Sequence, residues 1–373
     1  MDRRSGITER AERPVTTMYN RSLHRFALFT ACATFCLVVA GGLVTSTGSG
    51  LAVPDWPLSY GQVMPPMVGG IFYEHGHRMV ASFVGLLTTI LAFWLWRADG
   101  RRWVRILGFA ALGAVIVQGI LGGLTVLFLL PTPVSVAHAT IAQSFFSLTV
   151  FLALVTSRVW MEGAPGPFAA AGRTRLFVLA AAGAVFTQLV LGAWMRHSDA
   201  GLAIPDFPSS FGRLVPPGGP EGLSWINKLR LDDYDLPPVA PSQVWIHFAH
   251  RAGALLAGIA VLACGMHILR SYRDDRRLRE PAIVMIMLVL VQILLGALTV
   301  WTGKGVQIAT AHVATGALLF GTCIFTAARS FHHYALPVSA APALVNPVAP
   351  AVAPPVAPAV APEFSVSPKP ART

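Results

Sequence analysis

Long apolar segments alternate with short polar segments along most of the chain. Eight of the apolar segments reach the ~20 residues that a helix needs to cross the hydrocarbon core of a bilayer. The alternation therefore predicts an all-α polytopic membrane protein with eight transmembrane helices. Their predicted ranges are 26–47, 72–96, 104–129, 134–157, 175–196, 243–269, 281–302 and 306–328.

The composition agrees with this pattern, because 54% of the residues are hydrophobic and only 12% are charged. Soluble domains carry more charge. The net charge of +11 comes largely from basic residues in short loops between apolar segments, where it encodes membrane topology and gives no reason to expect nucleic acid. The four cysteines lie inside apolar segments and form no CxxC pair, so neither a disulfide framework nor a zinc site is indicated.

The basic residues gather on one side of the predicted membrane. That side holds 18 Lys and Arg residues, whereas the opposite loops hold 4. The positive-inside rule therefore predicts that both termini are cytoplasmic and that the loops 48–71 and 197–242 face outside. The N-terminal segment contains acidic residues and no evident cleavable signal, which favours the inner membrane of a bacterial cell.

The membrane part of the sequence repeats once. Gly-Leu-Ala-Val-Pro-Asp-Trp-Pro at 50–57 returns as Gly-Leu-Ala-Ile-Pro-Asp-Phe-Pro at 201–208, and Val117–Val126 matches Val291–Val300. We expect two tandem four-helix bundles related by a pseudo-two-fold axis along the membrane normal. The predicted parts are a cytoplasmic N-terminal segment at 1–25, an N-terminal half at 26–157, a cytoplasmic linker at 158–174, a C-terminal half at 175–328 and a Pro/Ala-rich disordered cytoplasmic tail at 329–373.

Four histidines obey the repeat, each within a few residues of the outer end of its predicted helix. His77 and His138 are 61 residues apart, and His250 and His312 are 62 residues apart. Each half thus offers two imidazoles at one depth. Zinc prefers more ligands and copper often recruits Met or Cys, whereas a heme iron takes one or two imidazoles in an apolar slot between helices. A hydrogen bond to a neighbouring helix is the plain alternative for a single histidine, but two pairs in register favour two hemes, one per half.

The charged residues beside these histidines differ between the halves. Arg78 and Arg251 follow the first histidine of each half, and they either bind heme propionates or reach from the interface as ordinary arginines. Glu74 lies one helical turn before His77, whereas His247 stands at the matching position. Ionisable groups at membrane depth are costly and mark functional sites. Glu74 is therefore either a catalytic carboxylate or the ion-pair partner of Arg78.

Other polar and aromatic residues near these sites have plainer predicted roles. His75 points to a different helix face from His77 and is predicted to be interfacial. Asp55 and its repeat equivalent are expected to anchor the outer loops. Trp56 and Phe207 are predicted either to cover a heme or to hold their loop in the interface.

These motifs resemble those of the heme A synthase family over about residues 24–330. The resemblance implies that His77 and His138 belong to the catalytic half, where heme O binds, and that His250 and His312 are axial ligands of a heme b. The segments that carry it are Gly48-Ser-Gly-Leu-Ala-Val-Pro-Asp-Trp-Pro57, Glu74-His-Gly-His-Arg78, His138, His250-Arg251 and His312.

The resemblance also implies a reaction. The family oxidises a methyl substituent of heme O to a formyl group through a hydroxymethyl stage, with oxygen from water, and so makes heme A for cytochrome oxidase. Glu74 resembles the family's catalytically important carboxylate. The implied partners are heme O, delivered by the heme O-forming farnesyltransferase, an electron acceptor and the lipid bilayer, and a homo-oligomer is compatible with the sequence. Some members carry a cysteine pair in the first outer loop, which is absent from 48–71.

Two other functions compete with heme A synthesis. A di-heme b-type electron-transfer cytochrome would use the same four histidines. The presence of Glu74 in just one of the two halves is evidence against it. A transporter built on a parallel repeat would place its binding groups near the midplane of the membrane. The histidines cluster instead near the outer ends of their helices, which is evidence against a transporter.

Overall fold

The computed structural model describes residues 18–163, 171–334 and 365. Contacts divide the chain into two compact units, residues 1–336 and 337–373, and of the second unit only Ser365 is described. The predicted disordered tail lies outside the described residues from 335 onward, that one residue apart, and residues 1–17 of the predicted N-terminal segment lie outside them as well. Every described helix belongs to the first unit.

The described part of the first unit is helical, with no strand among its residues. Eight of its helices are long and apolar enough to cross a membrane, which confirms the predicted fold class. These helices are α1 (Arg21–Ser46), α2 (Gly69–Ala98), α3 (Arg102–Leu127), α4 (Thr132–Val155), α6 (Ala171–His197), α8 (Pro241–Ser271), α9 (Arg276–Trp301) and α10 (Val306–His333).

Seven of the eight long helices begin before the predicted apolar segments, and at α9 a polar contact completes the added turn. Helix α9 begins five residues before Pro281, where the predicted segment started. Proline has no N–H, so the carbonyl of Arg277, one turn earlier, loses its partner in the helix. The guanidinium of Arg329 on α10 donates to that carbonyl at 2.9 Å, which replaces the missing bond. Helix α10 likewise runs to His333, past the predicted start of the tail at 329.

Two further helices lie in segments that were predicted only as a linker and an outer loop. Helix α5 (Arg158–Glu162) begins at Ser157, whose hydroxyl accepts the N–H of Trp160 at 3.2 Å. Helix α7 (Gly219–Tyr234) ends at Asp235, which has φ of 50°. Ile226 of α7 packs in a small buried cluster with outer-loop residues and α8. The periodicity of α7 was hard to recognise because its polar residues outnumber its buried ones.

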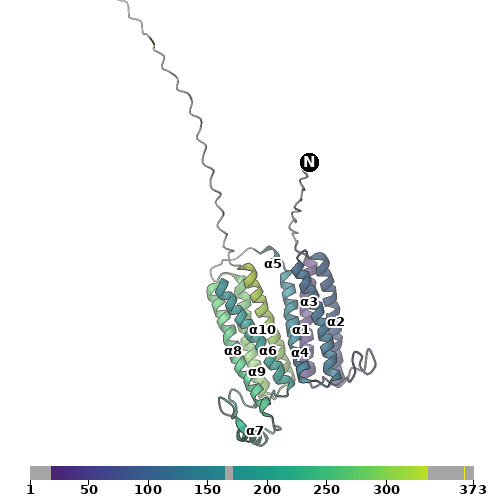
Figure 1. Ribbon diagram of the computed structural model, residues 1–373, viewed down its shortest axis with the longest axis vertical. Helices are drawn as coiled ribbons and strands as arrows, with labels where there is room; N and C mark the ends of the chain where they lie inside the picture. The colour runs from purple at the N-terminus through teal and green to yellow at the C-terminus, as the bar shows by residue number, and fades with distance from the viewer. Residues whose placement is uncertain (1–17, 164–170, 335–364, 366–373) are drawn as a thin grey trace, which may run out of the picture. The chain divides into compact units, whose positions relative to one another are not determined.

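The eight long helices pack as two groups of four (Figure 1). Helices α1–α4 contact one another around one core, and α6, α8, α9 and α10 pack around a second. Helices α1 and α4 also contact α10, and α4 contacts α6, so the two groups share an interface within one compact unit. Val38, Phe146 and Ala317 are buried together at that interface. The pseudo-two-fold axis and the boundaries of the halves stay predictions.

Much of the apolar surface of these helices faces outward. In the most hydropathic stretch of each spanning helix, between 17% and 44% of the residues are buried inside the protein. Leu255 and Leu256 of α8 are each 66% exposed, and Phe29 of α1 is 51% exposed. Lipid tails cover such residues without cost, so the exposed rows of Leu, Ile and Phe indicate a multi-pass membrane protein.

The repeated sequence in the two loops, 47–68 and 198–218, folds alike. In the first loop, the two carboxylate oxygens of Asp55 accept the N–H groups of Tyr60 and Gly61 at 2.7 and 2.8 Å. Asp206 binds Phe211 and Gly212 in the same way at 2.7 and 2.9 Å. The predicted turn-anchoring role of these aspartates agrees with these contacts. We call the end of the helices that bears these two loops the loop end.

The Asp55 turn supplies a prediction about pH. The N–H of Gly61, together with that of Tyr60, holds the pKa of the Asp55 carboxyl below its ordinary 3.8. Because the pKa is depressed in the folded loop, the stabilisation is complete above pH 3.8 and is lost as the pH falls through the lower value of the folded state. Amide exchange at Tyr60 and Gly61 should therefore stay slow, after correction for intrinsic rates, down to that range.

Asp55→Asn should speed exchange of the same two amides several-fold at pH 7, since an amide offers one acceptor where a carboxylate offers two. Hydrogen-exchange mass spectrometry of peptides from 48–68 measures both effects. Asp233→Asn, an exposed change on α7, is the matched control and should leave these peptides unchanged. Equal exchange in the two variants would contradict the turn assignment.

Candidate functional site

Each of the four predicted ligand histidines lies against a glycine of the neighbouring helix. A Cβ added to these glycines would lie 2.9 to 3.4 Å from the ring Cε1, closest at Gly192. The lack of a side chain at each position therefore lets ring and helix approach closely. The pairs are His77 with Gly41, His138 with Gly122, His250 with Gly192, and His312 with Gly296.

Gly122 of α3 and Gly296 of α9 lie in the repeated segments 117–126 and 291–300, whereas Gly41 and Gly192 lie outside the recognised repeats. Both lie nine residues before the repeated Gly50 and Gly201 loop motif, so extending the repeat upstream into α1 and α6 would have found them. The sequence cannot show that an imidazole edge fills the space beside each glycine. The structure shows that each histidine and its glycine are on adjacent, packed helices.

The polar atoms of these rings are incompletely paired. The Nδ1 atoms of His77, His138 and His312 are buried without a hydrogen-bond partner. Buried polar atoms without partners are uncommon in proteins and call for an explanation such as a bound group. The described residues contain no cluster of three or more His, Cys, Asp or Glu that could hold a metal ion by itself. Paired imidazoles with apolar surroundings suit a heme iron better than a free metal ion.

The spacing of the C-terminal pair fits such an iron. The ring centres of His250 and His312 are 6.5 Å apart, and the ring planes are inclined by 75°. With imidazole–metal bonds of about 2 Å, one ion between two rings separates their centres by roughly 6 Å. The donor set, the glycine contacts and the ring spacing therefore all fit an axially ligated heme in this half.

Glutamines contact three of the four histidines. Gln188 on α6 lies closest, since its Nε2 donates to the His250 carbonyl at 2.9 Å and is 3.0 Å from His250 Nδ1. Gln118 Nε2 donates to the His138 carbonyl at 2.9 Å. Gln292 Nε2 lies 3.4 Å from His312 Nε2. The position that matches Gln188 in the N-terminal half is Leu37, so no glutamine of this kind serves His77.

Glu74 and Arg78 hold the first outer loop against α2. Glu74 is 4% exposed, and its carboxylate accepts the N–H of Val53 at 2.8 Å and bonds to Arg78 at 2.6 Å. Arg78 also donates to the carbonyls of Asp55 and Leu58 at 2.7 and 2.8 Å. Arg78 is therefore the ion-pair partner of Glu74 through Nη2, and its Nη1 binds the loop.

His247 and Arg251 make the matching contacts in the second half. Ile204 donates its N–H to His247 Nδ1 at 3.2 Å, and Arg251 approaches His247 Nε2 at 3.1 Å while binding the carbonyls of Ser209 and Ile204. A neutral imidazole accepts at one nitrogen only, whereas the Glu74 carboxylate accepts at both oxygens. The role of His247, which the sequence did not indicate, is therefore that of a weaker loop anchor.

Two further outer-loop contacts bear on the predictions. His75 was predicted to be interfacial, and this is wrong, because it is 6% exposed and its Nδ1 is 2.8 Å from the Ser59 hydroxyl. Its partner lies in the loop that folds over α2, which the helix pattern could not reveal. The Trp56 indole packs on Gly123, where a Cβ would lie 2.7 Å from the ring. Trp56 thus lies next to the glycine that contacts His138.

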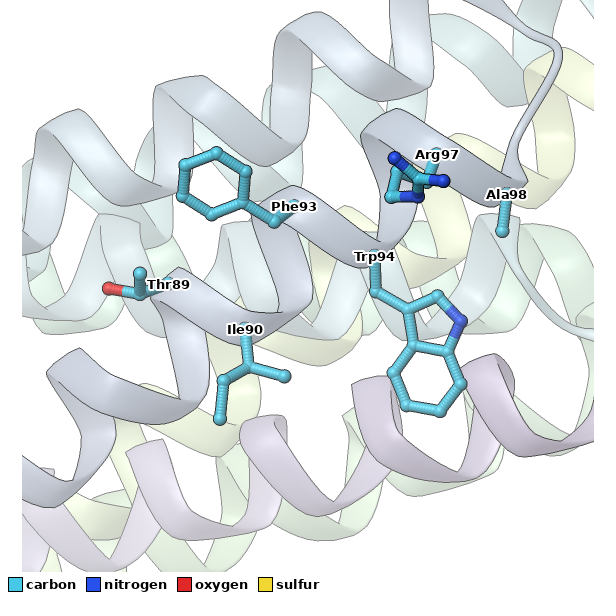
Figure 2. Close-up of a pocket in the computed structure, with 6 residues that line it drawn as sticks. All are labelled: Thr89, Ile90, Phe93, Trp94, Arg97 and Ala98. Atoms are coloured by element: carbon cyan, nitrogen blue, oxygen red, sulfur yellow. The ribbon is translucent and has the colours of Figure 1, made fainter.

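A shallow hollow occurs elsewhere, on the far part of α2 (Figure 2). It is lined by Thr89, Ile90, Phe93, Trp94, Arg97 and Ala98, all from one helix. These residues begin more than three turns after His77, so the hollow is no part of the histidine sites.

Comparison with known proteins bears on these sites. The family model described as cytochrome oxidase assembly protein, COX15-CtaA, matches residues 24–324. The chain belongs to this family.

Two relatives of the chain match most of its length. A protein named heme A synthase from Geobacillus kaustophilus is 28% identical over 328 residues, which cover 86% of this chain and 95% of the relative. The protein of that name from Halalkalibacterium halodurans is 30% identical over 316 residues, covering 82% and 96%. The resemblance drawn from the motifs is thereby confirmed.

The Glu74–Arg78 pair supplies a second prediction. Its side chains are 5% and 15% exposed, so removing either partner strands a buried charge. A double-mutant cycle with Glu74→Gln and Arg78→Gln should give a coupling energy of roughly 1–3 kcal/mol in the free energy of unfolding. Denaturant unfolding in mixed micelles measures it.

The control is the Arg158–Glu162 pair, which has the same 2.6 Å separation but is 74% and 50% exposed. Its coupling should stay below about 1 kcal/mol, because water screens exposed pairs. Equal coupling in the two cycles would show that burial of the Glu74 pair contributes nothing.

Proposed function

We propose that this protein is a heme A synthase, which oxidises a methyl substituent of heme O to a formyl group and so makes heme A for cytochrome oxidase. Membership of the family and the name shared by its relatives support the activity. The observation that carries the proposal is the pairing of four histidines with four glycines, two pairs in each group of helices. The reaction adds one oxygen atom from water and releases electrons and protons, through a hydroxymethyl stage.

The two histidine pairs have different partners in this proposal. His77 and His138 hold the iron of the substrate, heme O. His250 and His312 hold a resident heme b, which when bound relays electrons away from the substrate. The 6.5 Å ring spacing supports the second assignment. Water is excluded from the apolar interior of each group of four helices, and this strengthens the charge interactions at the substrate.

Glu74 has a dual role in the proposal. Its carboxylate is one helical turn from His77, so it lies near the edge of a ligand bound there. A carboxylate at that edge stabilises positive charge that develops on the methyl carbon, and it accepts a proton from the attacking water. Its bonds with Arg78 and the Val53 N–H hold the carboxylate in one orientation. Arg78 and Arg251 are also proposed to lie near heme propionates, with the loop contacts as their main observed role.

The setting of the reaction follows from the predicted topology. The heme sites are proposed to lie near the outer face of a bacterial inner membrane, with both termini cytoplasmic. The heme O-forming farnesyltransferase is the proposed source of substrate, an acceptor in the membrane takes the electrons, and assembly as a homo-oligomer is compatible with this scheme. The runner-up, a di-heme b-type electron-transfer cytochrome, would perform no chemistry on either heme.

The third prediction tests the activity. The chain co-expressed with the heme O-forming enzyme should yield heme A upon extraction and chromatography of its hemes. Glu74→Gln should retain bound heme and lower the heme A yield at least tenfold, by the loss of one charge-stabilising group.

Asp55→Asn is the control, because it loosens the same loop but keeps the carboxylate of Glu74. If both variants lose heme A equally, Glu74 acts through the loop alone. If the unmodified chain contains only heme b under these conditions, the electron-transfer alternative is correct.

The fourth prediction tests the heme b site. His250→Ala or His312→Ala should abolish the low-spin heme b absorbance and leave binding of heme O to the N-terminal half. Gly192→Val should weaken the same signal, since the new side chain would displace the His250 ring. Gly183→Val, on α6 where a Cβ would meet nothing within 4 Å, is the matched control. An unaltered spectrum in both histidine variants would disprove the assignment.

A further inference from the structure

Helix α6 carries three residues at helical spacing beside the C-terminal histidines. Gln188 bonds to the His250 carbonyl, and Gly192 approaches the His250 ring. Residues four apart lie on the same helix face, so Arg196 is next in this row, one turn closer to the loop end. The row thus continues from the His250 contacts toward the loop end.

Arg196 lies where α1, α6 and α10 meet. Its Nη2 donates to the Ser46 hydroxyl at 2.7 Å and is 3.3 Å from the Gly42 carbonyl on α1. Ser46 in turn accepts a hydrogen bond from Thr310 at 3.0 Å. Thr310 is two residues before His312, so the guanidinium is connected through Ser46 to the helix of His312.

The charge of Arg196 is not balanced within the described part of the chain. None of the five ion pairs found there includes it, and its Nε and Nη1 make no hydrogen bond to a described residue. Buried Arg230 and half-buried Arg251 differ from it, because each uses all three nitrogens on loop carbonyls or a histidine. A guanidinium with a free edge at a membrane site suits a bidentate carboxylate.

The row differs in the N-terminal half. The residues of α1 that match Gln188, Gly192 and Arg196 are Leu37, Gly41 and Thr45. Thr45 carries no charge, and its hydroxyl bonds to the Gly41 carbonyl of its own helix at 3.1 Å. The glycine that receives the histidine is common to both halves, whereas the two polar contacts beside it occur only in the C-terminal half.

We propose that Arg196 binds a propionate carboxylate of the heme held by His250 and His312, and so retains that heme while the N-terminal heme exchanges. A resident cofactor needs slow release, whereas a substrate must leave as product. Thr45 at the matching position leaves the N-terminal heme without this anchor. This inference rests on the proposed function for the identity of the two hemes.

The test measures release of heme b from the full-length purified protein to excess apomyoglobin. Arg196→Gln should speed release roughly ten- to hundredfold, the range for loss of a charge-assisted hydrogen bond. Ser46→Ala is the matched control, because it removes the contact between helices and keeps the cation. Its release rate should stay within a few-fold of the unmodified protein. Arg196→Lys keeps the charge without the planar fork and should give an intermediate rate.

A second arm uses iron protoporphyrin dimethyl ester, loaded into full-length protein from heme-depleted cells. The unmodified protein should release the ester faster than heme b, and Arg196→Gln should make this difference several-fold smaller. Release from Arg196→Gln as slow as from Ser46→Ala, or an unchanged difference between ester and heme, would overturn the proposal. A lipid phosphate bound by Arg196 would give that second outcome.

The assay separates this inference from the proposed function. If the unmodified protein makes no heme A but shows the predicted release rates, the synthase activity is wrong and the carboxylate anchor stands. If heme A is made and Arg196→Gln has no effect on release, only the anchor is wrong.

Discussion

The rest of the structure depends on the close approach of a glycine-bearing helix to a histidine ring. The same contact occurs four times, and it is tightest at Gly192, where a methyl group would displace the His250 ring. Between helices in lipid there is little hydrophobic driving force, so small residues that permit close packing do much of the stabilising. Here the glycine also determines where an imidazole lies. The same glycine contacts therefore both pack the helices and position the candidate ligand histidines.

The loops depend on a second requirement, the burial of charged and polar groups near the loop end. Arg78 and Arg251 hold their loops by carbonyl groups, and each rests on a partner one turn earlier, Glu74 or His247. Because an uncompensated charge at this depth is costly, each arginine contributes stability only while its loop is folded. A folded loop in turn packs on the helices, as Trp56 does on Gly123 of α3. Loop folding and burial of the arginines are thus coupled.

The two halves share this framework and differ in a few side chains. Glu74 accepts two hydrogen bonds where His247 accepts one, so the N-terminal half has the stronger loop anchor and the carboxylate. The C-terminal half has Gln188 and Arg196 beside its histidines where the N-terminal half has Leu37 and Thr45. Such a distribution suits one half that retains its ligand and one that exchanges it. A duplicated framework with unequal side chains is a direct way to place two unlike sites in one chain.

Much of this protein could be predicted from its sequence. Runs of apolar residues determine spanning helices because unpaired backbone groups are intolerable in lipid, and eight of them were recognised. The duplication and the four histidines could also be recognised, since the same residue types recur at a fixed spacing. Helix α7 and the buried position of His75 were not, because both depend on a loop folding back over the helices.

Only the tertiary structure decided what each polar residue contacts. Sequence left Glu74 as either a catalytic group or an ion-pair partner, and the structure shows the ion pair with Arg78 at 2.6 Å. The roles of Gly41 and Gly192 follow only from the structure, which places a histidine of the adjacent helix against each glycine. In the sequence, Arg196 is only the last residue of a predicted apolar segment, and the structure adds its contact with Ser46 on α1. The physical reason is common to all three, because contacts between helices depend on rotation and separation, which sequence periodicity leaves open.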